Sequence, residues 1–190
     1  GQFDVFHFSD WMYPPQRDGL RATTIHDLVP IRHPEWVTQQ TRRMHQAKYR
    51  ASGECDVVCV NSRYTGRDVE EHLGERCPPT AVAYPGIDPR FRPDGARADL
   101  GGPYVLTVCT HEPRKNLQTL LDGFRLVRRS YGDLKLVVVG AQGWGEQPDL
   151  RADGVLELGF VDDARLAELY RGTAVFAYPS KFEGFGMPVV

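Results

Sequence analysis

The chain has 190 residues, of which 41% are hydrophobic and 25% are charged, a composition typical of a folded globular protein. A formal net charge of -2 argues against a protein that coats nucleic acid, so we expect no nucleic-acid partner. No apolar run approaches the ~18 residues that a membrane-spanning helix needs. The sequence leaves peripheral membrane association open.

The four cysteines form no C-x-x-C pair, and Cys59 and Cys109 lie inside apolar, strand-like runs. This pattern predicts reduced thiols in a cytoplasmic chain. A zinc site with Cys55, Cys59 and His45 as ligands is the alternative, although their spacing matches no usual zinc pattern. We expect no metal site.

The first part of the chain predicts an alternation of strands and helices. Four apolar or β-branched runs predict strands at 3–8, 22–26, 57–60 and 80–84. Helices are expected between them, at 35–50 and 62–73. Pro34 suits the first turn of the first helix, and Asn61 or Ser62 suits the N-cap of the second.

Residues 86–102 are rich in proline and glycine and predict a linker between two domains, at 1–85 and 103–190. The second domain repeats the alternation, with strands predicted at 104–109, 135–140, 155–158 and 174–178. A helix with one buried face follows the first of them, and its apolar positions are Leu117, Leu120, Leu121, Phe124 and Val127. Asp162 is expected to cap a second helix.

Buried parallel strands separated by helices indicate a doubly wound α/β fold in each domain. The connection at 141–154 has no helical pattern, although this fold normally places a crossover helix there. We therefore interpret both domains as incomplete.

The sequence His111–Asn116 follows a predicted strand and leads into the helix that begins near residue 117. Parallel sheets bind ligands beyond the carboxyl ends of their strands. Arg114 and Lys115 in the first helical turn oppose the helix dipole unless an anion such as a diphosphate is bound. Two solvated surface cations are the equally weighted alternative.

A second candidate segment, residues 179–188, also follows a strand and precedes a predicted helix. Gly184 and Gly186 allow the backbone to approach a ligand closely. Glu183 accepts hydrogen bonds only, which suits sugar hydroxyl groups better than phosphate. A tight turn with an exposed glutamate is the simpler interpretation of this segment alone.

Together the strings HEPRKN, KLVVVG, LGFV and YPSKFEGFGMPVV resemble the donor-binding half of retaining glycosyltransferases of the GT-B class, in the group called group 1 or family 4. The strings TIHDL at 24–28 and YPGID at 84–88 are similar to motifs of the same class. The resemblance implies a GT-B fold, in which two Rossmann-like domains face a cleft and bind donor and acceptor.

The resemblance also implies roles for residues of the second domain. It places Lys115 at the donor diphosphate, and many members have an arginine at the position of Thr110, which Arg114 could replace. Phe160 and Val161 match the segment that meets the nucleotide base.

Further donor contacts are implied around the second segment. Glu183 matches the first glutamate of the E-x7-E motif, which binds the donor sugar. The backbone of Gly184, Phe185 and Gly186 would face sugar and phosphate. His26, from the other domain, would face the sugar, and these implied roles make Lys115, Glu183 and His26 the candidate catalytic residues.

The implied activity is transfer of a hexose from a nucleotide-diphosphate sugar to an acceptor hydroxyl, with retention of configuration. The donor would be a GDP- or UDP-sugar acting as co-substrate, with no cofactor and no metal. The acceptor would be a glycan, a lipid-linked molecule or a small molecule, and His7 could line its cleft. A GT-B epimerase or hydrolase and a catalytically silent sugar-nucleotide-binding protein are the alternatives.

Overall fold

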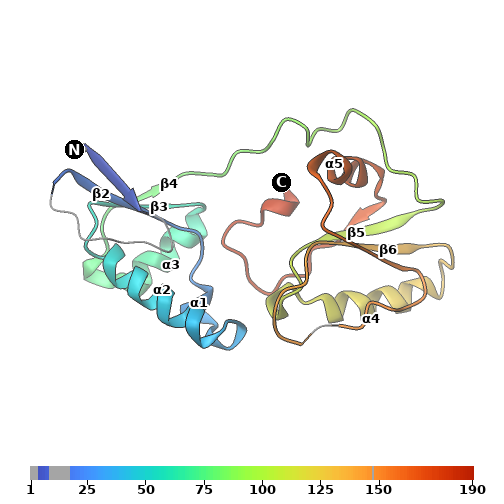
Figure 1. Ribbon diagram of the computed structural model, residues 1–190, viewed down its shortest axis with the longest axis horizontal. Coiled ribbons are helices and arrows are strands. Elements are labelled where there is room, and N and C mark those ends of the chain that lie inside the picture. The colour runs from blue at the N-terminus through green and yellow to red at the C-terminus, as the bar shows by residue number, and fades with distance from the viewer. Residues whose placement is uncertain (1–3, 9–17, 147) are drawn as a thin grey trace. The chain divides into compact units, whose positions relative to one another are not determined.

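The computed structural model describes residues 4–8, 18–146 and 148–190 (Figure 1). The chain forms two compact units, of which the first comprises Gly1–Gly86 with Glu183–Gly186 and the second Ile87–Phe182 with Met187–Val190. Phe3, in the first predicted strand, lies outside the described residues.

The first unit contains a parallel sheet of four strands in the order β1-β2-β3-β4. They are β1 (Val5–Phe8), β2 (Leu20–Ile25), β3 (Val57–Val60) and β4 (Thr80–Val82). All four strands were expected from the sequence. β2 begins two residues earlier than predicted and β4 ends two residues earlier.

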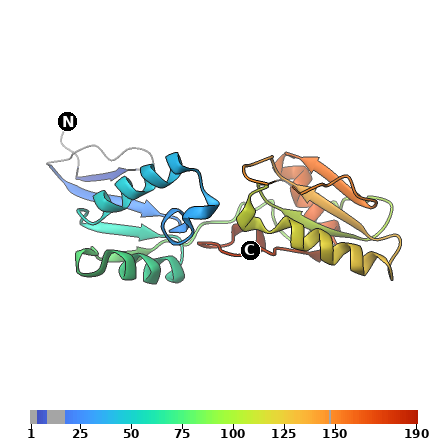
Figure 2. The ribbon, with the colours of Figure 1, turned by 90° about the horizontal axis from the view of Figure 1, so that it is seen from below.

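Helices α2 (Gln39–Ser52) and α3 (Arg63–Leu73) pack on the same face of this sheet, as Figures 1 and 2 show. The reason is topological: the strand order advances in one direction, and right-handed crossovers then place successive helices on one side. The shared core consists of Ile25, Leu28, Tyr49, Val58, Val60, Val69 and Leu73.

The predicted start of the helix at 35–50 is wrong. Pro34 opens a separate 3-10 turn, Pro34–Trp36, and α2 begins at Gln39 after Thr38, whose hydroxyl accepts the Thr41 N–H. His33 stacks on Trp36 at a ring separation of 3.9 Å, and the extended residues Val37 and Thr38 separate this turn from α2. The short helix α1 (Val29–Arg32) was also missed. Ser62, by contrast, caps α3 as predicted.

The second unit contains a parallel sheet in the order β7-β6-β5-β8. Its strands are β5 (Tyr104–Val108), β6 (Lys135–Val139), β7 (Val155–Gly159) and β8 (Val175–Phe176). The chain moves outward from β5 to β7 and then returns across the sheet to place β8 on the other side of β5. The strand order therefore reverses between β5 and β8.

Helices α4 (Leu117–Arg128) and α5 (Asp163–Gly172) cover opposite faces of this sheet, as expected when the strand order reverses (Figure 1). Alternate residues of β6 supply both cores. Leu136 and Val138 pack with Leu121 and Phe124 of α4. Val137 and Val139 face the other way and share a core with Leu169 of α5. The doubly wound α/β prediction is confirmed in this unit.

Some details of the second unit differ from the sequence expectations. Val127 was expected to be buried but is 47% exposed, because it lies at the edge of the apolar face of α4. The fully buried residues of this helix are Leu117, Leu121 and Phe124. β8 has two residues instead of five. A 3-10 turn, Met187–Val189, lies where a helix was predicted to begin. As expected, residues 141–146 and 148–154 contain no helix.

Lys48 of α2 is fully buried in the first unit, and its ammonium donates to the Thr24 carbonyl at 2.5 Å. Burial lowers the pKa of this lysine to about 8. The neighbouring Cys55 is also buried, and burial raises the pKa of its thiol. All four cysteines are free thiols. Among the described helices, none is long and apolar enough to cross a bilayer.

Candidate active site

The loops that follow β5 and β8 lie together at the carboxyl edge of the second sheet. The Lys181 N–H donates to the Arg114 carbonyl at 2.8 Å, and the Asn116 side-chain amide donates to the Pro179 carbonyl at 3.2 Å. The predicted proximity of the two loops is confirmed. They flank the point where the strand order reverses, which is where doubly wound sheets form their ligand crevice.

Lys115 is buried at this edge, and its ammonium lies 3.2 Å from the Tyr178 hydroxyl and 5.4 Å from the centre of the Tyr178 ring. The cation is thus held against an aromatic face that follows β8. The sequence predicted its position after β5 but missed its aromatic partner.

The prediction that Arg114 and Lys115 occupy the first turn of the amphipathic helix is wrong. They lie in a separate 3-10 turn, Pro113–Lys115. Asn116 follows in the left-handed conformation, at φ 60°, and α4 begins at Leu117. Asparagine adopts this conformation more readily than most residues because its side chain can bond locally. The turn presents the cations from a loop, so the macrodipole of α4 is not the reason for their placement.

Arg114 ties the two loops together. Its guanidinium donates to the Glu112 carboxylate at 3.0 Å and to the Phe182 carbonyl at 3.2 Å. Both partners of the ion pair are largely shielded from solvent, which makes the contact stronger than an exposed pair. The geometry gives Arg114 a positioning role, fixing the segment after β8 relative to the turn that carries Lys115.

Glycines of the loop after β6 allow close contact with the loop that contains Thr110. A Cβ on Gly140 would lie 1.9 Å from the Cys109 carbonyl oxygen, and one on Gly143 would lie 2.5 Å from that of His111. Parallel pairing continues there, since the His111 N–H donates to the Ala141 carbonyl at 3.0 Å. The packing role of these glycines follows from the tertiary structure and was not predicted from the sequence.

Replacing Gly143 by alanine should lower the free energy of unfolding by about 1–3 kcal/mol, because the added methyl group forces the His111 carbonyl away. Gly123, in the middle of α4, has no atom within 4 Å of an added Cβ. Gly123→Ala should therefore stabilise the protein by about 0.5–1 kcal/mol. Urea denaturation of both variants measures the difference, and equal effects would contradict the packing role.

In the first unit, His26 directly follows β2 and is exposed. Gly184, which this unit includes, is buried, and its carbonyl accepts from Ser62 at 2.6 Å and Thr65 at 3.1 Å. A Cβ on Gly184 would lie 1.9 Å from the His26 carbonyl oxygen, so only glycine fits. The structure thus brings two predicted site residues together through their backbones.

The remaining predicted residues have varied surroundings. Phe185 lies beside Tyr84 at a ring separation of 6.0 Å, and Gly186 has a φ of 86°. Phe160 is 86% exposed just after β7, whereas Val161 packs against the core under α5. Glu183 is half-buried.

The structure also places His7 and the three alternative zinc ligands, Cys55, Cys59 and His45. His7 lies on β1 and pairs with the Thr24 hydroxyl at 2.9 Å. The alternative zinc ligands are not brought together: no group of three potential ligand side chains is placed to hold a metal among the residues described.

Two family models match successive parts of the chain. The model described as Glycosyltransferase Family 4 matches residues 1–91, and the model described as Glycosyl transferases group 1 matches residues 102–190. Solved GT-B enzymes share the fold, including sucrose-phosphate synthase from Thermosynechococcus elongatus, with a TM-score of 0.72 and 17% identity over 98% of this chain and 52% of that one. This chain belongs to the GT-B glycosyltransferases.

Three further similar proteins come from bacteria. O-antigen chain mannosyltransferase B from Escherichia coli is 26% identical over 98% of the chain and 54% of its own length. A serotype-specific mannosyltransferase WbdA from Escherichia coli is 29% identical over 92% of the chain and 26% of its own length. The pneumococcal O-GlcNAc transferase GtfA, solved with UDP and GlcNAc, has a TM-score of 0.65 and 16% identity over 90% of the chain and 35% of its own. The chain therefore spans about half or less of the proteins it matches.

Proposed function

We propose that the protein transfers a hexose from a nucleotide-diphosphate sugar to an acceptor hydroxyl with retention of configuration, and that the hexose is mannose. The observation that carries the proposal is the buried Lys115 at the junction of the two loops after β5 and β8. The similarity to two mannosyltransferases supports the choice of sugar.

Lys115 would act electrostatically. Negative charge develops on the departing nucleoside diphosphate in the transition state, and a fixed cation lowers the energy of that charge most effectively where water is excluded. Lys115 is 8% exposed and is already oriented by Tyr178, so it would reorganise little during the reaction. Arg114 would hold the loops in place through Glu112 and Phe182.

The other roles follow from the motif resemblance. Glu183 would accept hydrogen bonds from hydroxyl groups of the transferred sugar, and the backbone of Gly184, Phe185 and Gly186 would face sugar and phosphate. His26 would face the sugar, and Phe160 with Val161 would meet the base. Thr110 replaces an arginine common in the class, and no residue is assigned a covalent role.

The acceptor would be the hydroxyl of a growing glycan, free or lipid-linked. The two mannosyltransferase relatives carry names that refer to O-antigen and serotype, which favours a surface polysaccharide. We further propose that transfer needs no metal ion and takes place in the cytoplasm, where the four free thiols would remain reduced.

The test is a donor panel with the complete protein, with GDP-mannose as the first candidate and mass detection of the product. We expect a glycosylated acceptor whose anomeric configuration matches that of the donor. His26→Ala should reduce turnover much more than donor binding. Free nucleoside diphosphate without a glycosylated product would instead indicate an epimerase or hydrolase, and inverted product would contradict retention.

A further inference from the structure

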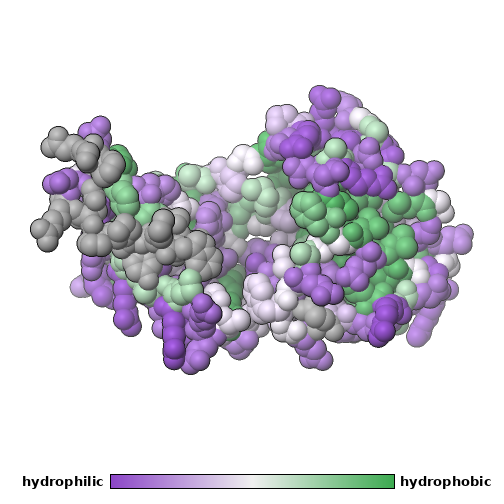
Figure 3. Space-filling model, viewed as in Figure 1, coloured by the Kyte–Doolittle hydropathy of each residue, from purple (hydrophilic) through white to green (hydrophobic). Residues whose placement is uncertain are grey.

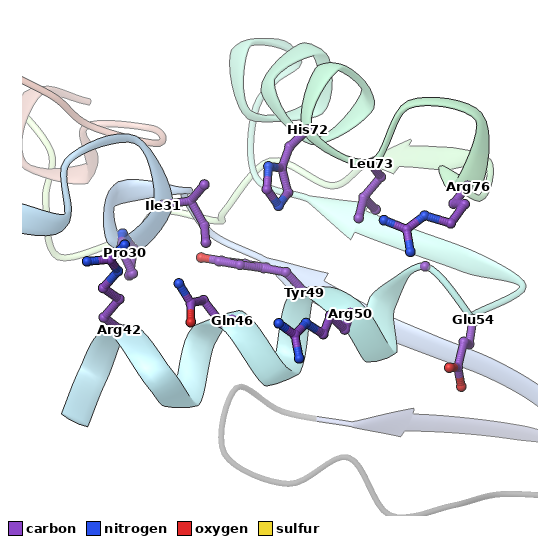
Figure 4. Close-up of a pocket in the computed structure, with 11 residues that line it drawn as sticks. Pro30, Ile31, Arg42, Gln46, Tyr49, Arg50, Glu54, His72, Leu73 and Arg76 are labelled. Atoms are coloured by element: carbon purple, nitrogen blue, oxygen red, sulfur yellow. The ribbon is translucent and has the colours of Figure 1, made fainter. Parts of the chain in front are cut away.

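A groove of about 670 Å³ lies in the first unit between α2 and the end of α3 (Figure 4). None of the residues assigned above to sugar transfer lines it. Its volume falls within the range of small-molecule sites in proteins. It is partly open to solvent, so it admits a ligand without any rearrangement of the helices.

The floor of the groove is apolar and rigid. Tyr49 is 3% exposed and its hydroxyl donates to the Asp27 carbonyl at 2.8 Å, so the ring is fixed. Leu73 and Ile31 flank it from α3 and α1 (Figure 4). The ring of His72 approaches the Tyr49 ring edge-on at 6.1 Å.

The rim of the groove is basic. Arg42, Gln46 and Arg50 are spaced four residues apart along α2 and therefore lie on one face of the helix. Figure 3 shows hydrophilic side chains along this lower edge of the unit, where Figure 1 places α2. Arg76 comes from the opposite side, after α3.

These three arginines, Arg42, Arg50 and Arg76, form no ion pair within the described ranges 4–8, 18–146 and 148–190. Arg32, just outside the groove, shows the contrast, because it pairs with Asp68 at 2.7 Å and Glu71 at 2.8 Å. Glu54 is the single acidic residue that lines the groove, and it lies 3.7 Å from Arg21. The groove thus has an excess of positive charge above an apolar floor.

We propose that this groove binds a phosphate-bearing ligand that also has an apolar portion. A guanidinium group can donate two parallel hydrogen bonds to two oxygens of one phosphate, which makes arginine a preferred phosphate-binding residue. The apolar part of the ligand would lie on Tyr49 and Leu73. Partial burial and the nearby Arg32 lower the pKa of His72, so its neutral imidazole can exchange hydrogen bonds with the ligand at neutral pH.

Calorimetric titration with hexyl phosphate, inorganic phosphate and hexanol tests the site. We expect saturable binding of hexyl phosphate, at least about tenfold tighter than either fragment, because only hexyl phosphate engages both rim and floor. Arg42→Gln with Arg50→Gln should weaken hexyl phosphate by about tenfold or more. Absence of saturable binding to the unchanged protein would overturn the proposal.

The control is the pair Arg43→Gln with Arg129→Gln, which removes the same charge from two exposed positions outside the groove, one on α2 and one just after α4. It should change the affinity by less than about twofold. Equal weakening in both double variants would mean attraction by net charge alone and would overturn the site. Circular dichroism confirms that all variants are folded.

Vesicles identify the source of the phosphate. Phosphatidylcholine vesicles with and without phosphatidic acid are sedimented with the unchanged protein and both double variants. The ligand is a lipid headgroup if the unchanged protein and the control variant sediment only with vesicles that contain phosphatidic acid, and the variant without Arg42 and Arg50 does not sediment. Saturable hexyl phosphate binding without sedimentation assigns it to a free phosphate ester.

Discussion

Replacing Lys115 by methionine should weaken the binding of both a nucleotide sugar and the free nucleoside diphosphate by about tenfold to more than a hundredfold. Both ligands carry the diphosphate that we assign to this cation. Methionine keeps the length of the side chain beside Tyr178, so the loss reflects the missing charge rather than a cavity.

Glu183→Gln should weaken only the nucleotide sugar, because the free diphosphate has no sugar for the carboxylate to contact. Calorimetric titration of each variant with both ligands separates the two roles. Arg129→Met removes one charge from the far end of α4 and serves as the matched control, with affinities expected to stay within about twofold.

Two outcomes would contradict these assignments. Unchanged affinity for both ligands in Lys115→Met would make Lys115 a structural partner of Tyr178 alone. Equal weakening of both ligands in Glu183→Gln would remove its role in binding the sugar. Thermal unfolding of each variant confirms that the comparison concerns folded protein.

Because Lys48 is buried, we expect the free energy of unfolding to depend strongly on pH. Its pKa is about 8 in the folded state, below the 10.5 of an exposed lysine. Below pH 8 both states are protonated, so the cost of burying the charge is fully present. Between these two values the unfolded chain binds the extra proton, and the folded state gains stability as the pH rises.

Lys48→Met removes this dependence. Each pKa unit corresponds to about 1.4 kcal/mol. The free energy of unfolding of the unchanged protein, relative to that of the variant, should therefore rise by about 3 kcal/mol between neutral pH and pH 10.5. Urea denaturation at a series of pH values measures this. Cys55 titrates in both proteins, and its contribution largely cancels in the difference.

Lys181→Met, at an exposed lysine, provides the control and should leave the pH profile unchanged. Parallel profiles for Lys48→Met and the unchanged protein would show that the buried ammonium keeps its proton over the whole range. The hydrogen bond to the Thr24 carbonyl would then compensate for burial.

The sequence predicted those elements whose signal is local. The residues Leu136–Val139 are uniformly apolar and form a fully buried strand, as expected. Ser62 and Asp162 cap helices, since their side chains accept N–H groups three residues ahead. The juxtaposition of the loops after β5 and β8 followed from their position after parallel strands.

Elements decided by tertiary contacts were not predictable in the same way. Pro34 carries a valid helix-start signal, yet the backbone is extended at Val37 and Thr38, which ends that turn before α2 begins. Only Val175 and Phe176 of the strand predicted at 174–178 pair with β5, and no local pattern encodes that limit. The aromatic partner of Lys115 depends on the return of the chain across the sheet.

The placement of β8 beside β5 has a consequence for the order of folding. The pair Val105 and Val175 closes the longest loop of the second sheet, whereas β5 and β6 pair across a single helix. Closing a longer loop costs more chain entropy, and the strand that closes it, β8, has only two residues. During synthesis β5, α4 and β6 emerge before β8, so we expect Lys115 to meet Tyr178 only after β8 has paired, and the candidate site to be the last part of this unit to form.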